Sequence, residues 1–142
     1  GTHIGLILVY LGGSIGFNSW LIKGFMDTIS PSLDEAAKVD GATDFQIFRR
    51  IIAPLSRPIL VVIFVITFIG IYSDFILAAI FLKDKNLWTV AVGINTVFID
   101  DFNADWGVIA ASSVIAATPI AVLFIFFQKQ ITGGLTAGSV KG

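Results

Sequence analysis

Three long apolar runs dominate the hydrophobic pattern of the chain. Residues 4–22 and 107–127 carry no charged side chain, and residues 58–82 contain a single ionisable group, Asp74. A helix needs about 20 mostly apolar residues to cross the hydrocarbon core of a membrane. The pattern therefore predicts an all-α, polytopic membrane protein with three transmembrane helices at about 4–22, 58–82 and 107–127.

A fourth apolar run, residues 87–99, is too short to span a membrane, and we expect a short helix or a re-entrant piece there. Two further features concern the third predicted helix. Pro119 should bend it, and Gly133 and Gly134 should let the following tail turn away from it.

Composition supports lipid as the solvent. Hydrophobic residues make up 56% of the chain and charged residues 13%, whereas charged residues alone make up about a quarter of a typical soluble domain. With no cysteine and a net charge of −1, a disulfide-stapled module, a cysteine-based site and a basic nucleic-acid binder are all disfavoured. Because the sequence does not begin with Met, we expect a fragment that lacks an N-terminal portion.

The distribution of lysine and arginine predicts the orientation. Residues 23–57 carry five basic side chains and residues 128–142 carry two, whereas residues 83–106 carry two beside four aspartates. Basic residues are enriched in cytoplasmic loops. We therefore expect residues 23–57 and the tail 128–142 in the cytoplasm, and the loop 83–106 on the periplasmic side.

The first loop is too long for a plain connection and should contain structure of its own. Residues 32–35 and residues 43–46 each fit a capping box, the pattern in which a serine or threonine and a glutamate or glutamine close a helix start. Gly41 lies between them and suits the positive φ found just past a helix end. Pro54 should stop or kink the second helix. The loop therefore reads as two short helices joined by a glycine.

An apolar stripe of Phe45, Phe48 and Ile52 should line the second of these helices, with Arg49 and Arg50 facing elsewhere. Two interpretations of the loop remain open on these residues. It is either a pair of helices lying on lipid headgroups or a docking element for a cytoplasmic partner. Five acidic residues balance the five basic ones, which argues somewhat against binding to anionic lipid.

A spaced set of residues in this loop resembles the EAA motif of ABC importer permeases, E-A-A-x3-G-x9-I-x-L-P. The matching positions are Glu35, Ala36, Ala37, Gly41, Ile51 and Pro54. The chain departs from the motif at Ala53, where leucine is usual. Residues 40–43 and 134–142 resemble the carbohydrate-importing branch, most closely its maltose and maltodextrin permeases. The resemblance covers essentially the whole chain, as the C-terminal half of such a subunit.

The resemblance implies a type I importer permease of the bacterial inner membrane that moves a sugar. Its implied partners are a second, different permease subunit, two ATP-binding cassette subunits, a periplasmic solute-binding protein and membrane lipid. The EAA loop would be the coupling helix that docks on the ATPase and links its closure to alternating access. The implied docking residues are Glu35, Ala36, Ala37, Asp40, Gly41, Ala42, Phe45, Phe48, Arg49, Ile51 and Pro54. Glu35 would make a charge-assisted contact with the ATPase, or satisfy its own helix through the capping box, or both.

The tail is a second implied contact with the ATPase, through Thr136, Ala137, Gly138 and Lys141. The loop 83–106, which is acidic and carries Trp88 and Trp106, is either a contact for the periplasmic binding protein or a segment anchored at the membrane interface.

The sequence predicts no catalytic site of its own. It has no phosphate-binding G-x-x-x-x-G-K-[ST] segment, a single histidine at position 3, and no Ser/His/Asp or metal-binding constellation. We therefore expect no enzyme activity, no metal and no cofactor on this chain, with ATP and Mg²⁺ bound by the partner subunits.

Four side chains are candidates for the solute pathway, because sugars are held by aromatic faces and hydrogen-bonding groups: Asn18, Trp20, Tyr72 and Asp74. A carboxylate at mid-bilayer is costly and should face protein or water. Trp20 has an alternative role as an interfacial anchor, and Asp74 as a structural partner of the second permease.

Two alternative functions compete with sugar import. The first is an ABC permease for another solute such as a glycerol-phosphate ester, although the spans offer no basic pocket. The second is an ion-coupled secondary carrier with Asp74 as its ion site, which leaves the EAA loop unexplained.

Overall fold

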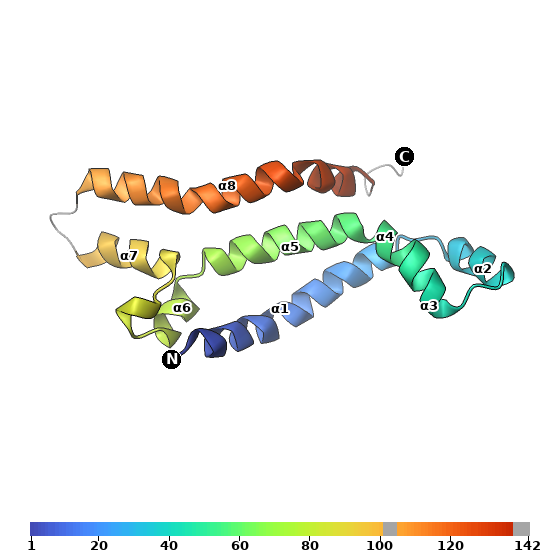
Figure 1. The fold of residues 1–142 in the computed structure, drawn as a ribbon, viewed down its shortest axis with the longest axis horizontal. Coiled ribbons are helices and arrows are strands. Elements are labelled where there is room, and N and C mark those ends of the chain that lie inside the picture. Colours follow the sequence, from blue (N-terminus) through green and yellow to red (C-terminus); the bar gives the residue numbers. More distant parts are fainter. Residues whose placement is uncertain (101–104, 138–142) are drawn as a thin grey trace. The chain divides into compact units, whose positions relative to one another are not determined.

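The computed structural model describes residues 1–100 and 105–137, with side chains for residues 1–96 and 105–132. Helices account for every regular element in these ranges, and none of the described residues forms a strand, so the predicted all-α class is confirmed (Figure 1). In chain order the elements are α1 (His3–Met26), α2 (Pro31–Val39), α3 (Asp44–Ile47), the π-helical turn η1 (Phe48–Ile52), α4 (Ala53–Leu55), α5 (Arg57–Tyr72), α6 (Ile76–Phe81), the 3-10 turn η2 (Lys85–Leu87), α7 (Val90–Asp100) and α8 (Trp106–Ala137).

Two of these helices are long and apolar enough to cross a membrane. They are α1, with 24 residues, and the 27-residue segment Trp106–Thr132 of α8. At about 1.5 Å per residue both exceed the hydrocarbon thickness of about 30 Å. Only 6% of the apolar window of each helix is buried, so their apolar side chains face outward, as helices solvated by lipid require.

The tail of α8 differs from the prediction. The helix continues without a break through Pro119 and through Gly133 and Gly134, and it ends at Ala137. The expectation that the two glycines turn the chain away from the third helix is therefore wrong. Glycine permits a departure from helical dihedral angles but does not impose one.

The second predicted span is not a single helix. The helix α5 covers 16 residues, about 24 Å at 1.5 Å per residue, and α6 begins only at Ile76 after a break at residues 73–75. The Asp74 carboxylate accepts a hydrogen bond from the backbone N–H of Leu77 at 3.2 Å. An aspartate that bonds a backbone N–H a few residues ahead starts a new helix rather than continuing the old one.

Helices α1, α5 and α8 each contribute to two compact units, which are described separately. The first unit comprises Gly1–Ile15 and Val65–Phe126. Its core consists of four buried side chains from α1, from α6 and the residue after it, and from α7: Leu6, Ala78, Leu82 and Val92. The short helix expected within residues 87–99 is present as α7. The chain leading into it is fixed, because the Trp88 indole N–H donates to the Leu82 carbonyl at 3.1 Å.

The second unit comprises Gly16–Phe64 and the part of α8 from Phe127 onward. The Phe64 ring lies edge-on to Phe127, with 5.9 Å between the ring centroids. Met26, at the end of α1, meets Ser56, at the start of α5. The two ends of the thirty-residue segment from Asp27 to Ser56 therefore lie close together in this unit. The segment contains α2, α3, η1 and α4.

Candidate functional site

The start of α2 differs from the predicted capping box. The helix begins at Pro31, with Ser30 as its N-cap, and the Ser30 side chain accepts no capping hydrogen bond from the helix backbone. Ser32 is therefore already inside the helix, where its backbone cannot act as a cap, and its hydroxyl lies 2.8 Å from that of Ser30. Proline suits the first helical position because the N–H that it lacks would have no partner there.

This correction changes the role open to Glu35. With no capping box to close, Glu35 lies exposed on α2. The structure records no ion pair or side-chain hydrogen bond for it among the described residues. The carboxylate is therefore available to a partner, and the alternative that it satisfies its own helix through a capping box is wrong.

The end of α2 is closed by a complete Schellman motif. The N–H of Gly41 donates to the Lys38 carbonyl, and the N–H of Ala42 donates to the Ala37 carbonyl, both at 3.0 Å. Gly41 has a φ of 81°, a left-handed conformation that glycine adopts without strain and that most other residues avoid. The predicted positive φ is confirmed, and the chain reverses direction sharply after α2.

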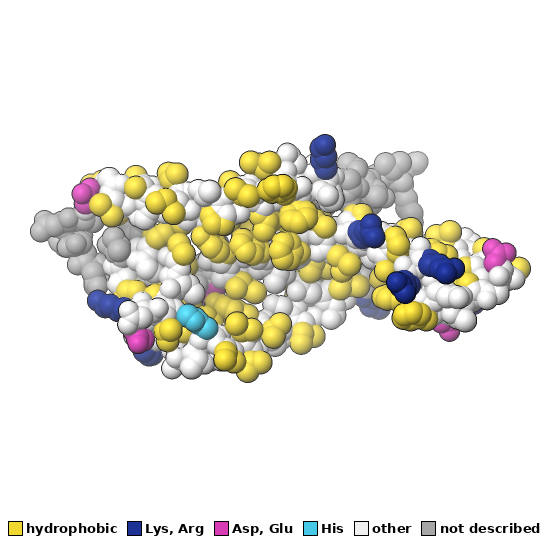
Figure 2. Space-filling model, in the orientation of Figure 1, with side chains coloured by type: hydrophobic (Ala, Val, Ile, Leu, Met, Phe, Trp, Pro, Cys, Tyr) yellow, Lys and Arg dark blue, Asp and Glu magenta, His cyan; other side chains and the backbone are white. Residues whose placement is uncertain are grey.

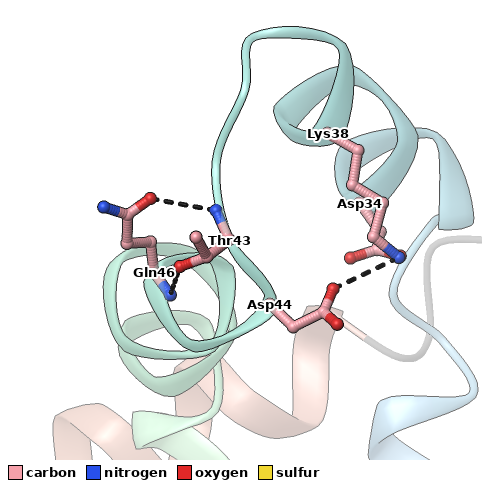
Figure 3. Close-up of polar contacts among 5 residues, drawn as sticks. All are labelled: Asp34, Lys38, Thr43, Asp44 and Gln46. Carbon is pink, nitrogen blue, oxygen red and sulfur yellow. Dashed lines mark hydrogen bonds and ion pairs between the residues drawn. The ribbon is translucent and has the colours of Figure 1, made fainter.

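The start of α3 has the predicted capping box. The Thr43 hydroxyl accepts from the backbone N–H of Gln46 at 3.4 Å, and the Gln46 side-chain oxygen accepts from the backbone N–H of Thr43 at 2.9 Å (Figure 3). Two backbone donors that a helix start would otherwise leave unpaired are thereby satisfied. Because α3 begins three residues after Gly41, both sides of the turn are determined by local sequence.

An ion pair across the turn was not anticipated from the sequence. The Lys38 ammonium lies 2.8 Å from the Asp34 carboxylate in the same helix and 3.5 Å from the Asp44 carboxylate at the start of α3 (Figure 3). The hydrogen bond and charge of Asp34, with a smaller contribution from Asp44, raise the pKa of Lys38 above its ordinary value. Lys38 thus joins α2 to α3 beyond Gly41. We call residues 31–47 the elbow.

The predicted apolar stripe is exposed at two of its three residues. The Phe45 side chain is 69% exposed and Phe48 is 55% exposed, whereas Ile52 is partly covered. Val39 at the end of α2 is 87% exposed. The residue of α3 that is buried is Ile47, at 3%, which the spacing of the stripe does not include. Ile51, four residues further on, is partly covered like Ile52, so the spacing of Ile47 and Ile51 was the signal for the inward face.

Basic side chains accompany this exposed apolar surface. Arg49 and Arg50 are both exposed, and Figure 2 shows basic and hydrophobic side chains together over the end of the chain that carries α2 and α3. A surface of this kind, with apolar side chains beside charged ones, is typical of a short helix that enters a groove on a partner.

The helix after the elbow is locally wide and then bends. In η1 the N–H of Ala53 reaches the Phe48 carbonyl, five residues back. Pro54 follows within α4, which ends at Leu55. The axis of Asp44–Leu55 and that of Arg57–Tyr72 differ by 60°. The predicted interruption before the next span is therefore present, and it falls at Ser56, two residues after Pro54. Wide turns and prolines are both established causes of sharp bends.

Two of the four solute-pathway candidates belong to the first unit. The Tyr72 hydroxyl donates to the Ala116 carbonyl of α8 at 2.9 Å. Tyr72 also lines a pocket of about 300 Å³ between α5, α7 and α8, together with Ser73, Asn95 and several small or aliphatic residues. Asp74 caps α6, and the buried Tyr10 hydroxyl faces its carboxylate without a hydrogen bond of ordinary geometry.

The other two candidates lie in the part of α1 that belongs to the second unit. The Trp20 side chain is 70% exposed, and its ring lies 6.4 Å from that of Phe17. Asn18 is half-buried. An outward-facing tryptophan near the end of an apolar helix is the arrangement of an interfacial anchor.

The tail candidates are described only in part. Thr136 and Ala137 belong to the last turn of α8, where the backbone alone is described, and Gly138 and Lys141 lie outside the described residues. In the described ranges, the structure holds no group of three or more histidine, cysteine, aspartate or glutamate side chains that would bind a metal ion.

Comparison with known proteins identifies the class of protein. Residues 2–135 match the family described as binding-protein-dependent transport system inner membrane component, and the chain belongs to this family of membrane transport components. It is 48% identical over 141 residues to the maltose/maltodextrin transport system permease protein MalG of Vibrio vulnificus strain YJ016. It is 45% identical over the same length to the protein of that name from Escherichia coli strain K12.

In both comparisons the match covers 99% of this chain and 47% of the relative. A third relative of the same name, from Photorhabdus laumondii, is 46% identical over the same proportions. The chain thus spans about half the length of the curated relatives that it matches.

Proposed function

We propose that this chain is part of a permease subunit of an ATP-driven, binding-protein-dependent importer of maltose, maltodextrin or a related oligosaccharide. Family membership and the similarity to maltose/maltodextrin permeases support this proposal. In it, α1, the broken segment α5–α6 and α8 are three spans of a type I importer permease in a bacterial inner membrane. The elbow and the C-terminal tail face the cytoplasm, and the loop 83–106 faces the periplasm.

The elbow carries the proposal, because its geometry suits transmission of force. A Schellman motif at Gly41, an ion pair from Lys38 to Asp44 and a capping box at Thr43 each fix part of the turn. A loop constrained at each of these points moves as a rigid body when a partner pushes on it. We assign the EAA residues, with Glu35 as the charged contact, to docking on an ATP-binding cassette subunit.

ATP and Mg²⁺ belong to the partner subunits in this proposal, and this chain contributes no catalytic residue. Two ATP-binding cassette subunits, a second and different permease subunit and a periplasmic solute-binding protein complete the transporter. Membrane lipid covers the outward-facing apolar side chains of α1 and α8. The last residues, from Thr136 to Lys141, make a second contact with the ATPase.

Within the solute pathway, the pocket beside Tyr72 supports a lining role for that residue. Asp74 takes the structural role instead, since its carboxylate is already engaged in capping α6. That engagement weighs against an ion-coupled carrier, in which the same carboxylate would have to bind and release a cation. Asn18 and Trp20 remain proposed contacts at the cytoplasmic end of the pathway.

The test is reconstitution of the full-length permease with the second permease and the ATPase subunits in proteoliposomes, with radiolabelled maltose and the periplasmic binding protein outside. We expect uptake that requires both ATP and the binding protein. Replacement Glu35→Lys should lower co-purification of the ATPase by at least about tenfold, because it reverses a charge-assisted contact. Glu35→Gln, which keeps the shape and the hydrogen-bonding oxygen, should lower it less. Uptake driven by an ion gradient without ATP, or undiminished assembly in Glu35→Lys, would overturn the proposal.

A further inference from the structure

Ser56 lies outside every motif considered so far, at the junction between α5 and the helical segment Asp44–Leu55. We call that segment, which comprises α3, η1 and α4, the elbow helix. It is 3% exposed, and among the described residues it is the buried side chain with a polar group. Burial of a hydroxyl is unfavourable unless the group is hydrogen-bonded. A serine held inside this otherwise apolar junction therefore calls for a physical reason.

The hydroxyl of Ser56 is bonded within its own helix. It lies 2.8 Å from the Ile52 carbonyl, which also accepts the Ser56 backbone N–H at 2.9 Å. A serine that bonds the carbonyl four residues back tends to bend a helix. The bend of 60° between Asp44–Leu55 and Arg57–Tyr72 falls at this residue.

Prolines precede and follow Ser56. Pro54 lies within the helical segment Asp44–Leu55 and has no N–H to donate to the preceding turn. Pro58 lies in the first turn of α5 and suits the start of a new helix there. The wide turn η1 precedes Pro54. The direction of the bend is then poorly determined by the backbone alone, and a side-chain hydrogen bond at its centre has a larger influence than it would in a regular helix.

The same hydroxyl meets the other end of the loop. The Met26 sulfur, at the end of α1, lies 3.8 Å from the Ser56 oxygen. A hydroxyl has one proton to donate, and the Ile52 carbonyl is the nearer and stronger of the two acceptors. The contact between the hydroxyl and the Met26 sulfur is therefore weak, either a shared hydrogen bond or a packing contact. Ser56 therefore touches both the point where the chain leaves α1 and the point where it enters α5.

We infer that Ser56 is a positioning residue for coupling. It sets the angle at which the elbow helix meets α5, and through Met26 it ties that angle to α1. Movement of the elbow is then passed to both helices together rather than absorbed at the junction. The inference rests on the proposed function, since coupling has meaning only if an ATPase acts on the elbow.

Two substitutions separate hydrogen bonding from volume. Ser56→Ala removes the hydroxyl and leaves a small void, whereas Ser56→Cys keeps the volume but offers only a weak S–H donor. The reconstituted full transporter is assayed for three quantities: co-purification of the ATPase subunits, the rate of ATP hydrolysis, and maltose taken up per ATP hydrolysed. Ser113→Ala is the matched control, because it makes the same chemical change at an exposed serine of α8.

Both Ser56 variants should assemble normally and hydrolyse ATP, with uptake per ATP lowered by about fivefold, the change that corresponds to one ordinary hydrogen bond. A spin-label pair attached to cysteines introduced at the exposed positions 50 and 60, in a transporter freed of other cysteines, should show a broader distance distribution in Ser56→Ala than in the wild type. The Ser113→Ala protein should match the wild type in all of these measurements.

Three outcomes would overturn the inference. Uptake per ATP could be unchanged in Ser56→Ala, or Ser56→Cys could behave as wild type while Ser56→Ala fails, which would assign the effect to volume. Reduced assembly with a normal ratio of uptake to hydrolysis would indicate a purely structural serine. Failure of the proposed function is distinguishable from all three, because the wild-type transporter itself would then show no ATP-dependent uptake.

Discussion

The backbone N–H of Ala42 donates to the carbonyl of Ala37 across Gly41, at 3.0 Å. This bond explains the spacing of the EAA residues in physical terms. In a Schellman motif the donor lies two residues past the helix cap and the acceptor three residues before it, with glycine between. An alanine followed four residues later by a glycine is therefore the local pattern that predicts a tight reversal after α2. Ala37 and Ala42, the two bonded residues, have small side chains that leave room for the chain to turn.

Replacement of Gly41 should strain this reversal. A side chain would meet open space at this position, so the cost comes from the φ of 81° and not from a clash. Gly41→Val should cost about 1–2 kcal/mol of elbow stability and lower co-purification of the ATPase by about tenfold. Gly41→Asn is the matched control, since asparagine tolerates the left-handed region. Equal assembly of the Val and Asn variants would contradict this account.

Thr43 and Ser32 should respond differently to the same truncation. Thr43→Ala removes the capping box and should destabilise the start of α3 by about 1 kcal/mol, whereas Thr43→Ser should preserve it. Ser32→Ala should have little effect, because Ser32 is not a cap. Amide hydrogen exchange of the assembled transporter measures the difference, in α3 for the Thr43 variants and in α2 for Ser32→Ala. Faster exchange of α2 in Ser32→Ala than in the wild type would contradict the helix start at Pro31.

The titration of Lys38 reports the ion pair across the elbow. Its pKa is raised in the folded chain by the two carboxylates, so the pair stabilises the elbow from neutral pH up to the ordinary lysine pKa of about 10.4. That stabilisation is lost as pH rises through the higher folded-state value. Isotope-edited NMR of the lysine side chains in the reconstituted protein should show the raised pKa. Asp34→Asn should lower it more than Asp44→Asn, and the reverse order would contradict the geometry.

Salt provides an independent check on the same pair. All three carboxylate and ammonium groups are substantially exposed, so the attraction should weaken at high ionic strength. Raising the salt concentration should bring the wild-type elbow close to the Lys38→Met variant in amide exchange. A difference between the two proteins that persists in high salt would show that Lys38 acts through its aliphatic stem and not through its charge.

Truncations at Phe45, Phe48 and Ile47 should separate docking from folding. Phe45→Ala and Phe48→Ala remove exposed side chains and should weaken co-purification of the ATPase while leaving the permease intact. Ile47→Ala opens a cavity at a buried position and should destabilise the elbow by about 2–5 kcal/mol. Thermal unfolding of the purified permease, followed beside the co-purification assay, distinguishes the two effects. Loss of thermal stability in Phe45→Ala would contradict an exposed docking surface.

Local features of the elbow were predictable because they depend on neighbours in sequence. The positive φ of Gly41 and the capping box between Thr43 and Gln46 each involve residues within one turn of chain. The wrong prediction at residues 32–35 has the same origin. Pro31 places the helix start two residues earlier than the serine–glutamate spacing suggested.

Features that depend on distant neighbours were not predictable in this way. The spacing of Phe45, Phe48 and Ile52 identifies an apolar face, but apolar faces point either to the rest of the chain or to a partner. Here Ile47 is the buried residue of α3, so Phe45 and Phe48 point away from the rest of the chain. The contact of Ser56 with Met26 joins residues thirty positions apart, and no short-range pattern encodes it.

The sequence alone determined that the chain is helical and apolar enough for a membrane, and where its first loop turns, because hydropathy and backbone capping are properties of short segments. The tertiary structure decided that the second apolar run breaks at residues 73–75, which face of α3 is buried, and that both ends of the loop meet at Ser56. These outcomes depend on which surfaces pack together in space. Packing is a property of the folded chain as a whole, and for this reason the same apolar pattern was compatible with more than one arrangement.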